Sequence, residues 1–224
     1  MAKQLFDEWP ERYDRWFETP VGKAVLQYES ELTLDLLRPG QGEKILDAGS
    51  GTGIFSREFL RRGAKVVGLD ISFAMLLYAA RKAVQGQAYA GIAADMAALP
   101  FADGSFDKTV SVAALEFVAD EKQAVAELFR VTKPGGAIVV ATLNSLSPWA
   151  ARRSANARRD PESIFNRVFF RSPLQLLAAT TVSGVVRTAV HFGKEDDPAT
   201  FDRTERQGEG QDTGAFVAAR WVKP

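Results

Sequence analysis

Short apolar runs alternate with amphipathic stretches along the first two thirds of the chain. The apolar runs are residues 44–48, 65–69, 88–94, 106–113 and 137–143. Most of the stretches between them repeat apolar side chains at helical spacing. Strands that alternate with helices pair in parallel and are buried on both faces, so they contain continuous apolar runs. The pattern therefore predicts an α/β fold, with a mostly parallel sheet and helices on both faces.

Several residues indicate where the helices begin and end. Residues 20–37 carry an apolar stripe at helical spacing, and the Pro39-Gly40 pair is expected to end this helix. A second helix is predicted at 54–62. Ser72 and Asp120 are suited to cap two more helices, because their side chains accept hydrogen bonds from free N–H groups at a helix start.

The last third of the chain differs in composition. Residues 147–171 carry six arginines against two acidic residues and are predicted to be irregular. A short helix is expected at 173–181, followed by strands at 185–192 and 215–222. The polar stretch 193–214 leaves no room for a long helix, so these two strands are expected to pair antiparallel and complete the sheet. The whole sheet is predicted to have seven strands, of which one is antiparallel.

The amino-acid composition restricts the possible functions of the chain more than its possible folds. The 224 residues contain 28 Lys and Arg and 28 Asp and Glu, so the formal net charge is zero and no nucleic-acid partner is expected. Cysteine is absent, which excludes disulfides, thiolate nucleophiles and iron–sulfur clusters, and no metal site is predicted. The sequence has no secretory signal and no apolar run of membrane-spanning length, so a cytoplasmic protein is expected.

One tight turn carries most of the functional information. Asp47-Ala48-Gly49-Ser50-Gly51-Thr52-Gly53 lies between the first predicted strand and a helix. Its glycines let the backbone approach a ligand, and the free N–H groups at the helix start suit an anion. Asp70 ends the next strand and is placed to bind the hydroxyls of a ribose. A nucleoside ligand is expected. The usual dinucleotide spacing is broken, because Ile54 and Ser56 stand where a third glycine would be needed.

The turn is the first of five segments that resemble one known family. Residues 47–53 are similar to motif I of the class I S-adenosylmethionine-dependent methyltransferases, and residues 66–72 resemble the second motif. Residues 94–101, 106–117 and 127–136 resemble the later motifs, in the family's order. The subgroup resembled contains the ubiquinone and menaquinone methyltransferases and many small-molecule enzymes.

The resemblance implies a Rossmann-like fold, S-adenosyl-L-methionine as cofactor, S-adenosyl-L-homocysteine as product and a small-molecule methyl acceptor. It implies that the turn and the end of the fourth strand hold the methionyl part, that the acid after the second strand binds the ribose, and that neighbouring residues surround the adenine. A tyrosine near the N-terminus would contact the cofactor carboxylate. The implied cofactor-binding residues are Tyr13, Gly49, Ser50, Gly51, Gly53, Asp70, Ile71, Met75, Asp95, Met96, Val112 and Ala113.

The sequence assigns no catalytic residue. Glu116 and His191 are candidate bases, but a helix-end acid and a structural histidine explain them as simply. We expect residues 1–38 to form an N-terminal helical cap and residues 39–224 to form the cofactor-binding domain. Within that domain, residues 145–183 are a candidate substrate lid.

Three alternatives stay open at this point. The arginines of residues 147–171 either line a pocket for an anionic or aromatic acceptor or form a solvated loop balanced by the acidic residues of 193–212. The chain could also be a nicotinamide-dependent oxidoreductase, which NAD(H) would stabilise and S-adenosylhomocysteine would not. A third reading is a non-catalytic relative that binds the cofactor and regulates a partner, for which no methyl acceptor would be found.

Overall fold

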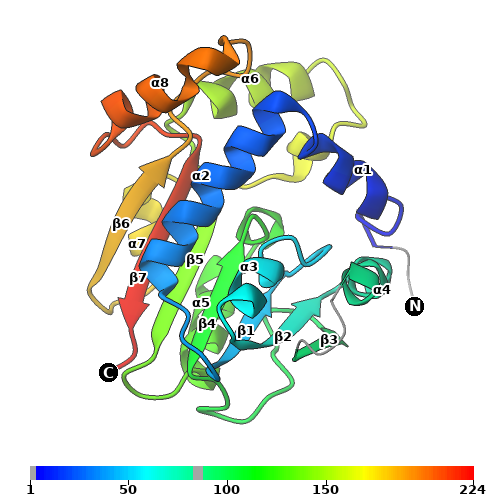
Figure 1. Cartoon of the computed structure of the whole chain (residues 1–224), viewed down its shortest axis with the longest axis vertical. Helices are drawn as coiled ribbons and strands as arrows, with labels where there is room; N and C mark the ends of the chain where they lie inside the picture. Colours follow the sequence, from blue (N-terminus) through cyan, green and yellow to red (C-terminus); the bar gives the residue numbers. More distant parts are fainter. Residues whose placement is uncertain (1–3, 83–87) are drawn as a thin grey trace.

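The computed structural model describes residues 4–82 and 88–224, and seven strands of this part form one sheet in the order β3-β2-β1-β4-β5-β7-β6 (Figure 1). β7 runs antiparallel to both of its neighbours, whereas the remaining pairs are parallel. The predicted seven-stranded Rossmann-like sheet with one antiparallel strand is confirmed. The strands are β1 (Lys44–Ala48), β2 (Lys65–Asp70), β3 (Tyr89–Ala93), β4 (Lys108–Val112), β5 (Ala137–Leu143), β6 (Gly184–Ala189) and β7 (Phe216–Val222).

Helices flank the sheet on both faces, as predicted. Two of them have the predicted caps: Asp120 accepts from the N–H of Gln123, and Ser72 accepts from the N–H of Met75. The α-helices in the described part are α1 (Pro10–Trp16), α2 (Pro20–Leu37), α3 (Ser56–Arg61), α4 (Phe73–Lys82), α5 (Glu121–Val131), α6 (Pro148–Ala157), α7 (Pro173–Leu177) and α8 (Phe201–Gly208). Three short 3₁₀ segments are η1 (Leu115–Phe117), η2 (Ile164–Arg167) and η3 (Pro198–Thr200).

The sheet separates two apolar cores. Along β5, Val139 and Ala141 point into the core that contains side chains of α2 and α3. Ile138 and Val140 point into the opposite core, with side chains of α5 and α7. All four side chains are fully buried, which is why this strand is continuously apolar rather than alternating. Figure 1 shows α2 crossing one face of β5 and β7, with α6 and α8 beyond one end of these strands.

One prediction for the last third of the chain is wrong. Residues 147–171 are not irregular throughout, because Ser147 caps helix α6 and Pro148 occupies its first turn. The buried face of this helix consists of Trp149, Ala150 and Ala157. Arg152 and Arg153 interrupt the apolar pattern in the sequence, so the helix was not predicted. The 193–214 stretch was expected to hold no long helix, and it contains the short, eight-residue helix α8, which buries Phe201.

The sixth strand is also shorter than expected. β6 ends at Ala189 because Val190 has a φ of +65°, which turns the chain out of the sheet. His191 therefore follows the strand instead of lying in it. The carboxylate of Glu205 accepts from the N–H groups of Val190 and His191 at 2.9 and 2.7 Å, so it fastens this bend to α8. No helix in the described residues combines the length and the apolar composition that crossing a membrane would require.

Candidate active site

The glycine turn connects β1 to α3 and is fastened to the end of β2. The N–H groups of Gly49 and Ser50 donate to the carbonyl oxygen of Leu69 at 2.6 and 2.9 Å. Gly49 has a φ of +79°, and a Cβ there would lie 2.2 Å from the Cβ of Ala114. Only glycine fits both the backbone conformation and this approach to the segment after β4.

Asp70 makes the second connection to the turn. Its carboxylate accepts from the N–H of Gly51 and from the N–H of Ser72, both at 2.8 Å. Burial raises the pKa of Asp70, and these two N–H bonds oppose that shift because they stabilise the charged form. A Cβ on Gly51 would meet no atom within 4 Å, so the turn borders open space here. An acid beside an open, N–H-rich turn fits the ribose and methionyl groups of S-adenosylmethionine.

Behind the turn, Asp47 is fully buried and accepts a hydrogen bond from the hydroxyl of Ser56 at 2.5 Å. Burial raises the pKa of Asp47 to about 7. Because its carboxyl is engaged with α3, this acid supports the shape of the turn.

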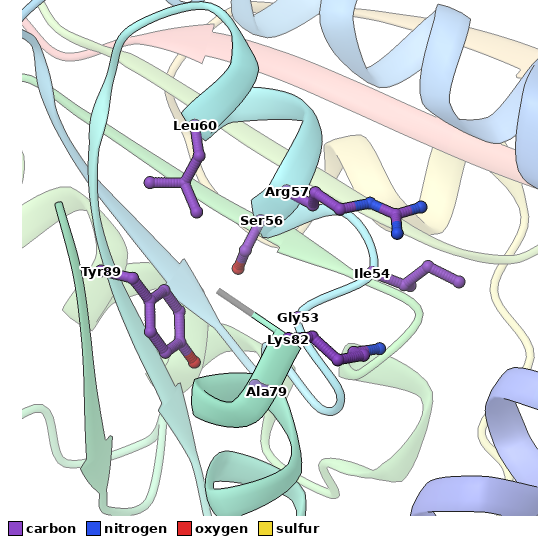
Figure 2. A pocket seen from close by; sticks show the side chains of 8 residues that line it. All are labelled: Gly53, Ile54, Ser56, Arg57, Leu60, Ala79, Lys82 and Tyr89. Carbon is purple, nitrogen blue, oxygen red and sulfur yellow. The ribbon is translucent and has the colours of Figure 1, made fainter. Parts of the chain in front are cut away.

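A small pocket opens behind Gly53, between α3, α4 and β3 (Figure 2). The hydroxyls of Ser56 and Tyr89 point toward its centre. Gly53 is the one predicted cofactor residue that lines this pocket, and Asp70 and the adenine-side residues that the sequence predicts do not line it. Its lining residues are Gly53, Ile54, Ser56, Arg57, Leu60, Ala79, Lys82 and Tyr89.

The N-terminal segment lies against the glycine turn and α4. The carboxylate of Asp14 accepts from the hydroxyl of Thr52 at 2.6 Å and from the ammonium of Lys82 at 2.5 Å. Asp7 accepts from the hydroxyl of Ser72 at 2.7 Å. These bonds bring Tyr13, the aromatic residue predicted to contact the cofactor, to the same edge of the sheet.

The other predicted cofactor residues lie at the ends of β2 and β3. Ile71 is 50% exposed, whereas Met75 is buried within α4. Asp95 is exposed and its carboxylate accepts from the N–H of Ala97 at 2.8 Å, while Met96 is buried. Ile71 is thus the apolar side chain of this group with the most surface open to a ligand.

At the end of β4, Val112 is buried and Ala113 has a φ of +51°. A non-glycine residue in this left-handed region is strained, and such strain is concentrated at functional sites. The N–H of Ala113 still donates to the carbonyl of Ala141 at 3.0 Å. The predicted residues therefore follow the carboxyl ends of β1, β2, β3 and β4, where ligands bind in open parallel sheets.

The structure adds functional candidates that sequence reasoning missed or left unassigned. Glu116 is only 2% exposed and accepts from the hydroxyl of Thr142 at 2.9 Å. Glu29 on α2 is 8% exposed, and Arg153 on α6 interacts electrostatically with both acids. Sequence reasoning missed Glu29, whereas Arg153 is one of the arginines of residues 147–171 that it considered as pocket lining. The signal for Glu29 was an acid on the apolar stripe of a helix, four residues after the buried Val25.

The arginines of the 147–171 segment divide between the two open interpretations. Arg152 is an exposed ion-pair partner of Glu195 at 2.7 Å, which balances charge with the acidic stretch. Arg171 is buried and donates to the carbonyl oxygens of Leu115, Val118 and Phe169, so it is structural. Arg153 interacts electrostatically with both Glu29 and Glu116, and Arg171 with Glu116.

Comparison with known proteins identifies the family of this chain. A family described as a methyltransferase domain matches residues 46–140. A demethylmenaquinone methyltransferase of Thermobifida fusca is 36% identical over 63% of this chain, which spans 61% of that protein. A malonyl-[acyl-carrier protein] O-methyltransferase of Pseudescherichia vulneris is 34% identical over 83% of this chain and 84% of its own length. Among solved structures, an S-adenosylmethionine-dependent methyltransferase of Thermotoga maritima superposes with a TM-score of 0.75 at 24% identity, covering 98% of both chains.

The doubly wound sheet, with its glycine turn at the carboxyl edge, has the fold of the methyltransferase class. This chain belongs to the methyltransferase-domain family and is an S-adenosylmethionine-dependent methyltransferase.

Proposed function

We propose that the chain binds S-adenosylmethionine along the carboxyl ends of β1 to β4 and transfers its methyl group to a small-molecule acceptor. The observation that carries this proposal is the tie between the N–H of Gly51 and the carboxylate of Asp70 at 2.8 Å. It holds an anion-binding turn and a ribose-binding acid beside each other before any ligand arrives, which lowers the entropic cost of binding.

The proposal gives each predicted residue one task. The backbone of the glycine turn and of Ala113 holds the methionyl group, Asp70 binds the ribose, and Ile71 packs on the adenine. Asp95 and Met96 read the edge of the adenine, and the buried Met75 supports Ile71 from within α4. Tyr13 closes the site from the N-terminal side. The cofactor supplies an activated methyl group, so the protein contributes mainly alignment of the acceptor, which can be worth about 7–11 kcal/mol.

The acceptor is proposed to enter from the side of α2 and α6, where residues 145–183 would cover it. The names of the relatives point to different acceptors, a demethylmenaquinone in one case and a malonyl-[acyl-carrier protein] in the other. These two names therefore do not identify the chemical class of the acceptor of this chain. We place the reaction in the cytoplasm, in line with the lack of cysteine.

Calorimetry with S-adenosylhomocysteine tests the cofactor assignment. We expect binding to the wild-type protein and at least tenfold weaker binding to Asp70→Ala, a loss of about 1.4 kcal/mol or more. Asp212→Ala is the matched control, because this aspartate is exposed, and its affinity should equal that of the wild type. Heat with NADH but not with S-adenosylhomocysteine would overturn the proposal in favour of an oxidoreductase. Transfer of labelled methyl groups to extracts of small molecules separates an active enzyme from a regulatory relative.

A further inference from the structure

The two outer strands of the sheet differ in how their free edges are protected. β3 and β6 are the ends of the strand order, so each of them pairs with a neighbour on one side. β6 carries the exposed Arg187, whose guanidinium forms an ion pair with Asp35. Charged side chains of this kind keep an edge strand from pairing with another chain. β3 lacks this protection, because residues 88–94 contain no charged residue and no proline.

The main chain of β3 presents hydrogen-bonding groups at its free edge. The N–H of Ala94, directly after the strand, donates to the carbonyl oxygen of Asp70 on β2 at 3.1 Å. Main-chain groups alternate between the two sides of a parallel strand, so every second residue points away from β2. Tyr89, Gly91 and Ala93 therefore turn their N–H and carbonyl groups outward. An unpaired row of this kind can accept a further strand.

Helix α4 adds an apolar surface beside this edge. Phe73 and Leu77 are 54% and 45% exposed, and Ala80 is exposed as well. Spacings of four and three place the three side chains on one side of the helix, which we call the α4 stripe. Lys82 lies on the opposite side and pairs with Asp14 of α1, so the α4 stripe faces away from α1. Figure 1 shows α4 beside β3 at this end of the sheet.

The free edge of β3 is symmetric about Gly91. When two copies of β3 are paired antiparallel around this residue, Gly91 lies opposite itself and Tyr89 lies opposite Ala93. Each of these opposed pairs exchanges two N–H···O bonds, about six in all. No charged side chain of residues 88–94 stands between the strands. The edge is thus complementary to a second copy of itself.

The same pairing brings opposite charges together. Helix α4 runs antiparallel to β3, because it connects the parallel strands β2 and β3. Its last turn lies at the start of β3, where Ala79 and Lys82 line one pocket with Tyr89. The exposed Arg81 is therefore at the start of β3, and the exposed Asp95 follows its end. Antiparallel pairing sets the Arg81 end of one copy against the Asp95 end of the other.

We propose that this chain forms a two-fold symmetric dimer through the free edge of β3 and the α4 stripe, with one continuous sheet across both copies. The symmetry covers both β3 edges at once, so the contact closes and adds no third copy. The apolar α4 stripes of the two copies lie on the same face of the joined sheet and cover each other. β6 stays outside the contact, with its charged edge at either end of the assembly.

Sedimentation equilibrium of the full chain tests the dimer. At about 0.1 mM the wild type should show twice the chain mass of 24.5 kDa. Leu77→Glu places two like charges in the shared stripe and should weaken association by about tenfold or more. Leu174→Glu makes the same change at a 78% exposed leucine on α7 and should leave association unchanged. A monomeric wild type, or equal association of Leu77→Glu and the wild type, overturns the proposal.

A second pair of variants identifies the strand edge. Ala90→Lys places a charge at an exposed position of β3, and Val185→Lys places one at an exposed position of β6. The first variant should dissociate the dimer and the second should not, because a lysine on an edge strand hinders pairing. Dissociation by Val185→Lys with no effect of Ala90→Lys would show that the copies join through β6, which contradicts the proposal.

Disulfide formation tests the register and does not depend on the charge variants. The chain has no cysteine, so introduced thiols have no competing partner. In the proposed pairing Ala90 lies opposite Ile92 of the second copy at a non-hydrogen-bonded position, with about 4.5 Å between Cα atoms, which a disulfide can span. After oxidation, the double variant Ala90→Cys/Ile92→Cys should run as a covalent dimer on a non-reducing gel. Val185→Cys/Arg187→Cys is the control on β6 and should run as a single chain. The same result for both double variants rejects the β3 pairing.

Discussion

The cofactor side and the acceptor side of this molecule are built on different principles. On the cofactor side, backbone N–H groups fix the shape of the turn. Three consecutive residues, Gly49, Ser50 and Gly51, donate hydrogen bonds that hold the turn to Leu69 and Asp70. On the acceptor side, the candidate groups are side chains: Glu29 and Glu116 are buried, and Arg153 is half-buried. The first arrangement tolerates almost no change in backbone shape, while the second can be altered one side chain at a time. The same scaffold can thus keep one cofactor and change its acceptor.

The largest effect that would sharpen this comparison is expected at Gly49. Gly49→Ala places a Cβ 2.2 Å from the Cβ of Ala114 at a φ of +79°, so the substitution combines overlap with backbone strain. We expect a loss of about 2–5 kcal/mol in the free energy of unfolding and loss of S-adenosylhomocysteine binding. Urea denaturation and calorimetry measure the two effects.

Gly51→Ala is the matched control for this substitution. Its φ of +52° carries the same kind of strain, but a Cβ there meets no atom within 4 Å. The cost should be about 1–2 kcal/mol, from strain alone. Equal destabilisation by the two variants would show that the close approach to Ala114 does not matter.

A smaller effect separates the arginines of the acceptor side. Arg171→Ala leaves the carbonyl oxygens of Leu115, Val118 and Phe169 without their buried donor, so we expect a loss of about 3 kcal/mol in stability. Arg152→Ala breaks one exposed ion pair with Glu195 and should cost under about 1 kcal/mol. Thermal or urea unfolding compares them directly. If the two variants are equally stable, the structural role of Arg171 is wrong.

The comparison also explains how far the sequence could be interpreted. The glycine turn, Asp70 and the strand–helix alternation are local patterns, because a turn or a helix cap is encoded within a few neighbouring residues. The seven-stranded sheet could therefore be predicted from the chain alone. The predicted end of a segment was wrong where a backbone change ends the element without a glycine or proline. The positive φ of Val190, which ends β6, is an example.

The residues of the acceptor side do not belong to a short sequence motif of this kind. Glu29 and Arg153 are brought together by the packing of α2 and α6 near one end of the sheet, and nothing in their sequence neighbourhoods links them. The arginines and the serine of α6 interrupt its apolar pattern in the sequence, which led to the wrong prediction of an irregular segment. The sequence shows that Glu29 lies on the apolar stripe of α2. Its role depends on which groups the fold places opposite it, and the sequence does not give these groups.

The pH dependence of stability gives the finest test of how the two sides differ. Burial raises the pKa of Glu29 from its ordinary value to about 8, so the folded state holds this proton more tightly than the unfolded state does. The free energy of unfolding contributed by Glu29 is then present at low pH and is lost as pH rises from about 5 to 8, with a slope of at most about 1.4 kcal/mol per pH unit. Among charged groups, Arg153 lowers the pKa of Glu29 and Glu116 raises it. Urea unfolding between pH 5.5 and 8.5 should therefore show a shallower decline for Glu29→Gln than for the wild type, while the exposed control Glu31→Gln follows the wild type. Parallel profiles for all three proteins would mean that burial does not raise the pKa of Glu29.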